Sequence, residues 1–512
     1  MPNPLILVYD MGTQSARAML VDKAGNILGK AQKKYEEPYF SPEPGWAEQK
    51  PSFYWEALCE CSRKLKTMLP DRWGDIIALT CTTIRDTCLC LDATRQPLRN
   101  CILWLDGRES SNESLPAVNK LLYALVGKTE TVKLQRRVSA CNWIAEHEPE
   151  LWAKTDKFVL LSCWLNYMIC GNLRDAAAST IGHLPFSNKA RTWMKPNDLI
   201  RPLFDIRDSQ TYELAESGEV LGTVTAAAAK LLEVPEGLPL IASGSDKACE
   251  TIGLGCIHEG SAALGFSTTA TVEVTTSRYV EPYPLVPPYV SILPGHWTPE
   301  VEIYRGYWLV SWFKREFARY EAAEAEREGI STEELLNRQL SSIPAGCLGL
   351  ILQPYFNPGL VMPHARGAAL GFTSAHTRMH FYRAIIEGIN FGLMEGLYSI
   401  EQRSKSKVHR LMIAGGGSQS AEICQITANM FGLPLQRIHT HEATGLGAAL
   451  TAFVGMGEFA DYDAAIAAMV RPAEAFQPDA AQHKIYQRLY TEVFAKAFDR
   501  LQPLYTALDL MK

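Results

Sequence analysis

The chain has 512 residues, of which 47% are hydrophobic and 21% charged, and its net charge is −6. This balance is typical of globular proteins with full-sized cores, and the length allows two or more domains. An acidic chain favours neither a nucleic acid nor an anionic membrane surface as partner, and no apolar run approaches the ~18 residues of a membrane span. The thirteen cysteines contain no Cys-x-x-Cys pair, which favours reduced thiols and a cytoplasmic location.

The first informative stretch is a predicted hairpin near the N-terminus. The apolar runs at residues 5–8 and 18–21 predict two strands. The segment between them carries Asp10, Gly12, Thr13, Gln14, Ser15 and Arg17. A glycine permits a tight turn whose amides can face phosphate oxygens, and Asp10 would repel an anion unless a cation lay between them. The pattern fits an ATP–magnesium site, and an ordinary hairpin with a polar turn explains these residues equally well.

Polar side chains follow two later apolar runs. The strand predicted over residues 76–82 leads to Arg85 and Asp86, and Trp104 lies at the end of the run that begins at residue 102. Strand ends are common positions for ligand contacts in open α/β sheets. A surface ion pair is the plain alternative for Arg85 and Asp86, and a core position is the alternative for Trp104.

Another strand is predicted over residues 238–243. It is followed by Gly-Ser-Asp, and a helix begins at once. Asp246 at this junction has two compatible interpretations. It can cap the helix, which stabilises a helix by about 1 kcal/mol. It can also act as a general base, because a carboxylate that is ionised at neutral pH accepts a proton from a substrate hydroxyl.

The second half of the chain repeats the opening pattern. Apolar runs at residues 262–266 and 270–274 enclose a bend rich in hydroxyl groups, formed by Ser267, Thr268 and Thr269. The similarity to the first hairpin predicts an internal duplication, with a junction near residues 250–260.

A glycine-rich turn is the last anchor. The strand predicted over residues 411–414 runs into Gly415, Gly416 and Gly417, and Ser420 precedes a predicted helix. A strand that leads through glycines to a helix N-terminus is a nucleotide-contact geometry, although it is neither the dinucleotide fingerprint nor a Walker A loop. The small-residue segment 442–449 predicts another helix, which we expect to pack against the sheet on the nucleotide side.

These anchors stand in a fixed order, together with a Trp-x-Asp-x-Arg segment at residues 104–108. From residue 5 to about residue 457 the chain resembles the FGGY carbohydrate kinases, the sugar and polyol kinases of the actin/hexokinase/Hsp70 superfamily. The resemblance implies an α/β fold of two actin-like (ribonuclease H-like) domains with a cleft between them. The expected domains are residues 1–254, with the substrate and the catalytic base, and residues 255–512, with the nucleotide.

The resemblance also implies roles for individual residues. Asp246 would be the catalytic base, Asp10 would hold Mg²⁺ through water, and the residues that contact the sugar would be Arg85, Asp86, Trp104 and Asp246. The residues that contact ATP would be Gly12, Thr13, Gln14, Ser15, Arg17, Ser267, Thr268, Thr269, Gly415, Gly416 and Ser420. The chain departs from the family at Ser267, where a glycine is usual, and this side chain would narrow the approach to the γ-phosphate.

The resemblance therefore implies ATP-dependent phosphorylation of a hydroxyl group on a small sugar or polyol, either a pentulose such as xylulose or a glycerol-like polyol. We expect ATP and Mg²⁺ as cofactors and a small-molecule partner rather than a nucleic acid or a membrane. Similar kinases are commonly homodimers, and by analogy we expect a homodimer here. An actin-like ATPase and a sugar-sensing pseudokinase are the alternatives. ATP turnover with and without a panel of ketoses and polyols distinguishes them.

Overall fold

The computed structural model describes residues 4–125, 127, 129–357, 359, 361–362, 364–509 and 511. They form two compact units, and each unit has its own hydrophobic core. Unit 1 comprises the chain up to Gly253 together with Tyr289–His296 and Thr444–Val470. Unit 2 comprises Leu254–Pro288, Trp297–Ala443 and the chain from Arg471 onward.

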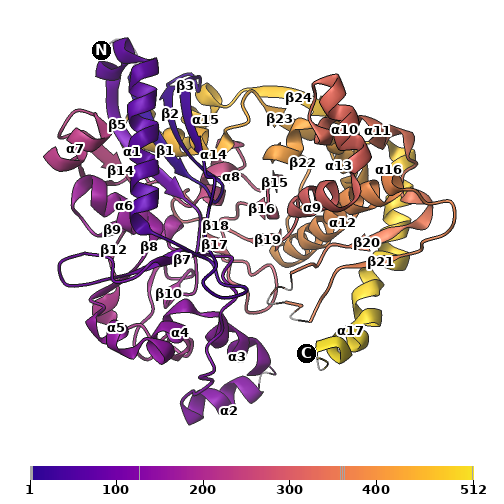
Figure 1. Ribbon diagram of the computed structural model, residues 1–512, viewed down its shortest axis with the longest axis horizontal. Helices are drawn as coiled ribbons and strands as arrows, with labels where there is room; N and C mark the ends of the chain where they lie inside the picture. Colours follow the sequence, from indigo (N-terminus) through magenta and orange to yellow (C-terminus); the bar gives the residue numbers. More distant parts are fainter. Residues whose placement is uncertain are drawn as a thin grey trace. The chain divides into compact units, whose positions relative to one another are not determined.

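The central sheet of unit 1 has the strand order β13-β14-β5-β1-β2-β3. All of these strands except β13 are labelled in Figure 1. Strand β1 is buried along its whole length, because it lies between antiparallel β2 and parallel β5. Strand β14 continues the parallel part beside β5. The bounds are β1 Leu5–Met11, β2 Ser15–Asp22, β3 Ile27–Lys34, β5 Ile76–Thr83, β13 Val220–Thr223 and β14 Pro239–Ile241.

The central sheet of unit 2 has the order β24-β23-β22-β15-β16-β19 and repeats the first sheet strand for strand. An antiparallel hairpin, β15 with β16, lies beside parallel β22, as β1 and β2 lie beside β5. The outer pairs agree as well, so this repeat supports the duplication indicated by the two hairpins. The bounds are β15 Ser261–Phe266, β16 Ala270–Val274, β19 Glu300–Ile303, β22 Arg410–Ala414, β23 Leu435–Ile438 and β24 Pro472–Phe476.

Helices cover the sheet of unit 1. Helix α1 begins with a proline at its first position, where no amide donor is needed, and contacts β2 and β3. The helices are α1 Pro51–Met68, α2 Ala117–Leu125, α3 Thr129–Val138, α4 Ala140–His147, α5 Pro149–Lys154, α6 Leu161–Cys170, α7 Ala226–Leu232, α8 Asp246–Gly253, α14 Ala443–Gly455 and α15 Tyr462–Met469. The short strands are β4 Glu48–Gln49, β6 Cys88–Leu91, β7 Cys101–Ile102, β8 Lys157–Leu160, β9 Arg174–Ala176, β10 Phe186–Ser187, β11 Thr192–Trp193, β12 Glu213–Ala215 and β17 Tyr289–Val290.

Unit 2 is organised around the long, largely buried helix α12, which contacts β16, β19 and β20. Gly392 and Gly396 allow this close packing, because an added Cβ would lie 2.8 Å from Ile303 and 2.6 Å from Val301. The helices are α9 Trp308–Phe317, α10 Arg319–Glu328, α11 Thr332–Gln339, α12 Arg378–Ser404, α13 Ala421–Phe431, α16 Ala480–Leu489 and α17 Ala495–Asp509, and the short strands are β18 Trp297–Thr298, β20 Ile351–Gln353 and β21 Ala368–Leu370. None of the helices described in either unit is both long and apolar enough to cross a bilayer.

The small-residue helix α14 does not pack where we expected. Its residues from Thr444 onward belong to unit 1, not to unit 2, where we expected the nucleotide to bind. An added Cβ at Gly447 would lie 1.9 Å from the carbonyl oxygen of Cys249 in α8, and one at Gly445 would meet the side chain of Met19 in β2. The predicted helix is therefore present, but the partner that the sequence analysis expected for it is wrong.

Candidate active site

Predicted site residues lie at the carboxyl ends of three neighbouring parallel strands of unit 1, at one edge of the sheet. Asp10 lies near the end of β1, Arg85 follows β5, and Asp246 follows β14. Because β1, β5 and β14 run in the same direction, their carboxyl ends meet at the same edge. A hydrogen bond from the Thr82 hydroxyl to the Gly244 carbonyl oxygen (2.9 Å) ties two of these ends together.

Asp246 is the first residue of helix α8, and its carboxylate accepts from the amide of Lys247 (2.8 Å). The hydroxyl of Ser245 accepts the hydrogen bond from the amide of Ala248 (3.3 Å), so Ser245 caps helix α8 and the capping interpretation of Asp246 is wrong. Burial raises the pKa of the Asp246 carboxyl to about 6, although Arg85 and Lys247 act in the opposite direction. A carboxyl group with such a pKa is poised to accept a proton at neutral pH.

Asp10 has the properties of a magnesium-binding carboxylate. It is 3% exposed, it accepts a hydrogen bond from Arg17 Nη1 (2.8 Å), and its charge raises the pKa of Asp246. In the part of the chain that the structure describes, no three His, Cys, Asp or Glu side chains gather as metal ligands. Mg²⁺ usually keeps several waters and is bound through one or two carboxylates plus substrate phosphates, so Asp10 fits the ion.

The bend between β1 and β2 leaves Thr13 and Gln14 at its tip. The amide of Gly12 donates to the carbonyl oxygen of Ser15 (3.0 Å), and the hydroxyl of Ser15 accepts from Gln32 Nε2 (3.0 Å). The groups at Gly12 and Ser15 therefore shape the bend. Gln14 is exposed and Thr13 is half-buried, and these two residues remain the best candidates for phosphate contacts.

Trp104 is connected to the same bend. Its indole N–H donates to the hydroxyl of Thr13 (3.0 Å), which links a predicted sugar contact to a predicted phosphate contact. The rest of the Trp-x-Asp-x-Arg segment is structural. Asp106 accepts hydrogen bonds from the amide of Ala47 (2.6 Å) and from Arg108 Nε (2.7 Å). These two hydrogen bonds fix the segment that follows Trp104.

Arg85 and Asp86 have partners that sequence reasoning missed. The guanidinium of Arg85 lies 5.1 Å from the centre of the Tyr289 ring. The carboxylate of Asp86 accepts from the amide of His183 (3.0 Å) and from its Nδ1 (2.6 Å). Burial lowers the pKa of His183, but Asp86 raises it more, so the pKa lies above its ordinary value. No motif or spacing in the sequence connects these four residues.

In unit 2, the bend at residues 267–269 lies beside the glycine-rich turn, because β15 and β22 are neighbouring parallel strands. The carbonyl oxygens of Ser267 and Thr268 accept from the amides of Tyr307 (3.2 Å) and Trp308 (3.3 Å) at the start of α9. The hydroxyl of Thr269 donates to the carbonyl oxygen of Tyr304 (3.1 Å). The backbone of the bend is therefore fixed, while the side chain of Thr268 is exposed.

The three glycines of the turn differ in their surroundings. Gly415 has φ +90°, and an added Cβ would lie 2.5 Å from the carbonyl oxygen of Phe266, so only glycine fits there. Gly417 lies against the ring of Tyr307, whereas nothing lies within 4 Å of a Cβ added to Gly416. Gly416 is thus the open member. The hydroxyl of Ser420 caps α13 by accepting from the amide of Ile423 (3.2 Å).

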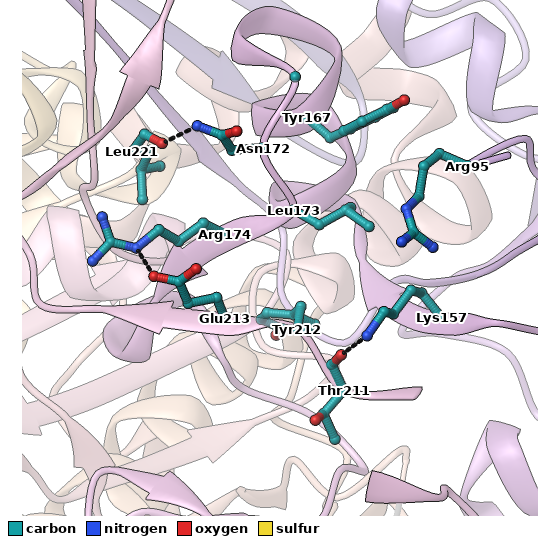
Figure 2. A pocket seen from close by; sticks show the side chains of 11 residues that line it. Arg95, Lys157, Tyr167, Asn172, Leu173, Arg174, Thr211, Tyr212, Glu213 and Leu221 are labelled. Atoms are coloured by element: carbon teal, nitrogen blue, oxygen red, sulfur yellow. Dashed lines mark hydrogen bonds and ion pairs between the residues drawn. The ribbon is translucent and has the colours of Figure 1, made fainter. Parts of the chain in front are cut away.

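Unit 1 also has a pocket of about 560 Å³ that none of the predicted site residues lines. Figure 2 shows Lys157 donating to the carbonyl oxygen of Thr211 (2.8 Å) and Arg174 paired with Glu213 (2.9 Å). Arg95, also in this pocket, pairs with Asp156. Because its cationic side chains are matched by groups of the chain itself, this pocket is not the candidate active site.

Solved structures share this two-domain α/β fold, and proteins related in sequence match nearly the whole chain. A gluconate kinase from Lactobacillus acidophilus superposes with a TM-score of 0.83 at 20% identity, over 99% of this chain and 100% of that one. A xylulose kinase of Lactococcus lactis is 27% identical over 492 residues, 95% of each chain. An autoinducer-2 kinase of Klebsiella pneumoniae is 26% identical over 503 residues, which cover 95% of this chain and 92% of the kinase.

Both halves of the chain match one family. Residues 5–253 match the N-terminal domain of the FGGY family of carbohydrate kinases, and residues 262–456 match its C-terminal domain. The chain therefore belongs to the FGGY family of carbohydrate kinases. It is a phosphotransferase that uses ATP with Mg²⁺ to phosphorylate a sugar or polyol, and the expected kinase activity is confirmed over the actin-like ATPase alternative.

Proposed function

We propose that Asp246 is the catalytic base and that Arg85 and Asp86 hold the sugar beside it. The observation that carries this proposal is that the neighbouring parallel strands β5 and β14 bring Arg85 and Asp246 to one sheet edge, where the charge of Arg85 lowers the pKa of Asp246. Arg85, which we expect to bind the substrate, therefore interacts at one sheet edge with Asp246, which we expect to take its proton.

In the proposed reaction, the Asp246 carboxylate accepts the proton of an acceptor hydroxyl. The hydroxyl oxygen forms a bond to the γ-phosphorus of ATP, the bond from that phosphorus to the bridging oxygen breaks, and ADP leaves. Thr13 and Thr268 are the hydroxyl groups that we propose as hydrogen-bond donors to the phosphates of ATP. Mg²⁺, held through Asp10, neutralises charge on the phosphate oxygens when it is bound.

We propose an open-chain pentulose such as xylulose, or a glycerol-like polyol, as the substrate class. A guanidinium donor beside a carboxylate acceptor suits neighbouring hydroxyl and carbonyl groups on a short carbon chain. The related proteins named as xylulose kinase and autoinducer-2 kinase support a small polyhydroxylated acceptor of this kind.

The test is ADP release by the purified protein with ATP, Mg²⁺ and one member at a time of a panel of pentuloses, hexuloses, glycerol and gluconate. We expect a pentulose or glycerol to raise turnover by orders of magnitude over the rate without acceptor. ADP release at the same rate with every acceptor and with none would contradict the proposal.

The departure at Ser267 gives a second arm to this test. The Ser267→Gly variant restores the usual residue of the family, so we expect a lower KM for ATP, or an unchanged one, with the same acceptor preference. A variant that gains sugar-dependent turnover where the wild type has none would identify the wild type as the pseudokinase alternative.

We also infer a cytoplasmic homodimer. Each of the thirteen cysteines is a buried free thiol, which fits a reducing compartment. Size-exclusion chromatography with light scattering measures the oligomeric state. A monomer at micromolar concentration would contradict the dimer.

A further inference from the structure

Asp86 has a backbone conformation that side chains rarely adopt. Its φ is +47°, in the left-handed region that is uncommon for residues other than glycine. Such outliers cost of order 1–3 kcal/mol and persist only where the surroundings hold them. The amide of Asp86 donates to the carbonyl oxygen of Ile181 (3.1 Å), so the segment at residues 181–183 is part of what holds it.

The same segment holds the side chain of Asp86. The backbone amide of His183 donates to Oδ1 (3.0 Å), and the ring Nδ1 donates to Oδ2 (2.6 Å), so each carboxylate oxygen has one fixed partner. Gly182 makes the approach possible, because an added Cβ there would lie 2.3 Å from Asp86 Oδ1. The side chains of Asp86 and His183 remain 27% and 28% exposed, which leaves part of the pair open to a ligand.

We propose that His183 is a positioning residue for the sugar: it fixes the Asp86 carboxylate beside Arg85 so that the remaining lone pairs accept substrate hydroxyls. This inference rests on the proposed function, in which Asp86 contacts the sugar. Each carboxylate oxygen already accepts one donor from the chain and keeps room for another. The site therefore selects ligands that offer hydroxyl donors at this position and rejects those that offer only acceptors.

The experiment compares His183→Ala with His183→Asn, because the amide nitrogen of asparagine can occupy the position of Nδ1 and donate to Oδ2. Hydrogen bonds to charged groups contribute enough to predict a roughly 10- to 100-fold increase in the KM for the sugar in His183→Ala. We expect the KM for ATP to stay within a factor of about two and His183→Asn to recover most of the loss, as rescue of one hydrogen bond predicts. Equal increases of both KM values, or no increase for the sugar, would overturn the inference.

A pair of glycine variants tests the same contact by another route. Gly182→Ala places a methyl group against Asp86, whereas Gly237→Ala adds one where nothing lies within 4 Å, at a backbone φ of +81°. We expect Gly182→Ala to raise the KM for the sugar and Gly237→Ala to leave it unchanged. The same increase in both variants would overturn the inference.

Asp86→Asn separates the two levels of the argument, because asparagine tolerates the left-handed backbone. An unchanged KM for the sugar in Asp86→Asn would refute the assignment of Asp86 to the substrate, and with it the proposed function. A raised KM in Asp86→Asn together with a wild-type KM in His183→Ala would refute only the role of His183.

Discussion

The Asp246→Asn substitution tests the catalytic base with little disturbance of the fold. Asparagine has nearly the same shape, its side-chain oxygen can still accept from the amide of Lys247 (2.8 Å), and Ser245 still caps the helix. The substitution removes the negative charge of the side chain and its ability to take a proton. General base catalysis contributes about 10²- to 10⁴-fold, so we expect kcat to fall by that factor while the KM for ATP is nearly unchanged.

The same substitution is expected to stabilise the protein. A carboxyl pKa raised from 3.8 to about 6 means that the ionised form costs the folded state about 3 kcal/mol relative to the unfolded chain. The folded state binds more protons between these two pH values, so wild-type stability falls as the pH rises from about 4 to about 6 and is then constant. Asp246→Asn should therefore unfold later than the wild type at pH 7.5, by up to about 3 kcal/mol, and this gain should shrink toward pH 4.

Three measurements check this reasoning: kcat with the preferred acceptor, kcat/KM against pH, and urea denaturation of both proteins at pH 7.5 and 4.5. For the wild type we expect an acid limb in kcat/KM with an apparent pKa near 6. Asp71→Asn, at an exposed position of the 3-10 helix Pro70–Asp75, is the matched control and should change neither activity nor stability. Wild-type turnover in Asp246→Asn, or an equal loss of stability at both pH values, would refute the reasoning.

Trp104→Phe removes the N–H donor to the hydroxyl of Thr13, so we expect the KM for ATP to rise about fivefold, the worth of one neutral hydrogen bond. Steady-state kinetics at saturating acceptor measure this, and a change confined to the KM for the sugar would show that the ring serves the sugar alone. Gly447→Ala forces a methyl group against the carbonyl oxygen of Cys249 and should cost about 2 kcal/mol or more of unfolding free energy. Gly74→Ala, where nothing lies within 4 Å, should stay within about 0.5 kcal/mol by thermal denaturation, and equal losses in both variants would contradict the packing argument.

The features of the fold that follow from local pattern were predictable from the sequence. The apolar runs before Asp10, Asp246 and Gly415 are the buried strands β1, β14 and β22, because a strand buried on both faces needs a continuous apolar sequence. The two bends rich in hydroxyl groups, between β1 and β2 and between β15 and β16, were also predicted correctly as the turns of hairpins. Their repetition also indicated an internal duplication, which the matching order of the two six-stranded sheets supports.

Features that depend on distant contacts were not predictable. His183 lies 97 residues from Asp86 in sequence, and only the folded chain brings them together. Helix α14 follows β22 and β23 of unit 2 in sequence, yet its Gly447 fits against the backbone of α8 in unit 1. Ser245 and Asp246 are adjacent acceptors at one helix start, and which of them caps depends on backbone angles that residue type alone does not set.

The return of residues 444–470 to unit 1 has a consequence for biosynthesis. A ribosome that has released the first 253 residues has not yet made α14 and α15. Cys249 in α8 and Met19 in β2 therefore lack their contacts with α14 until most of the polypeptide has emerged. Contacts between residues so far apart in sequence form late, because loop-closure entropy opposes them, and they slow folding. The first half of the gene thus encodes a unit that only the second half can complete.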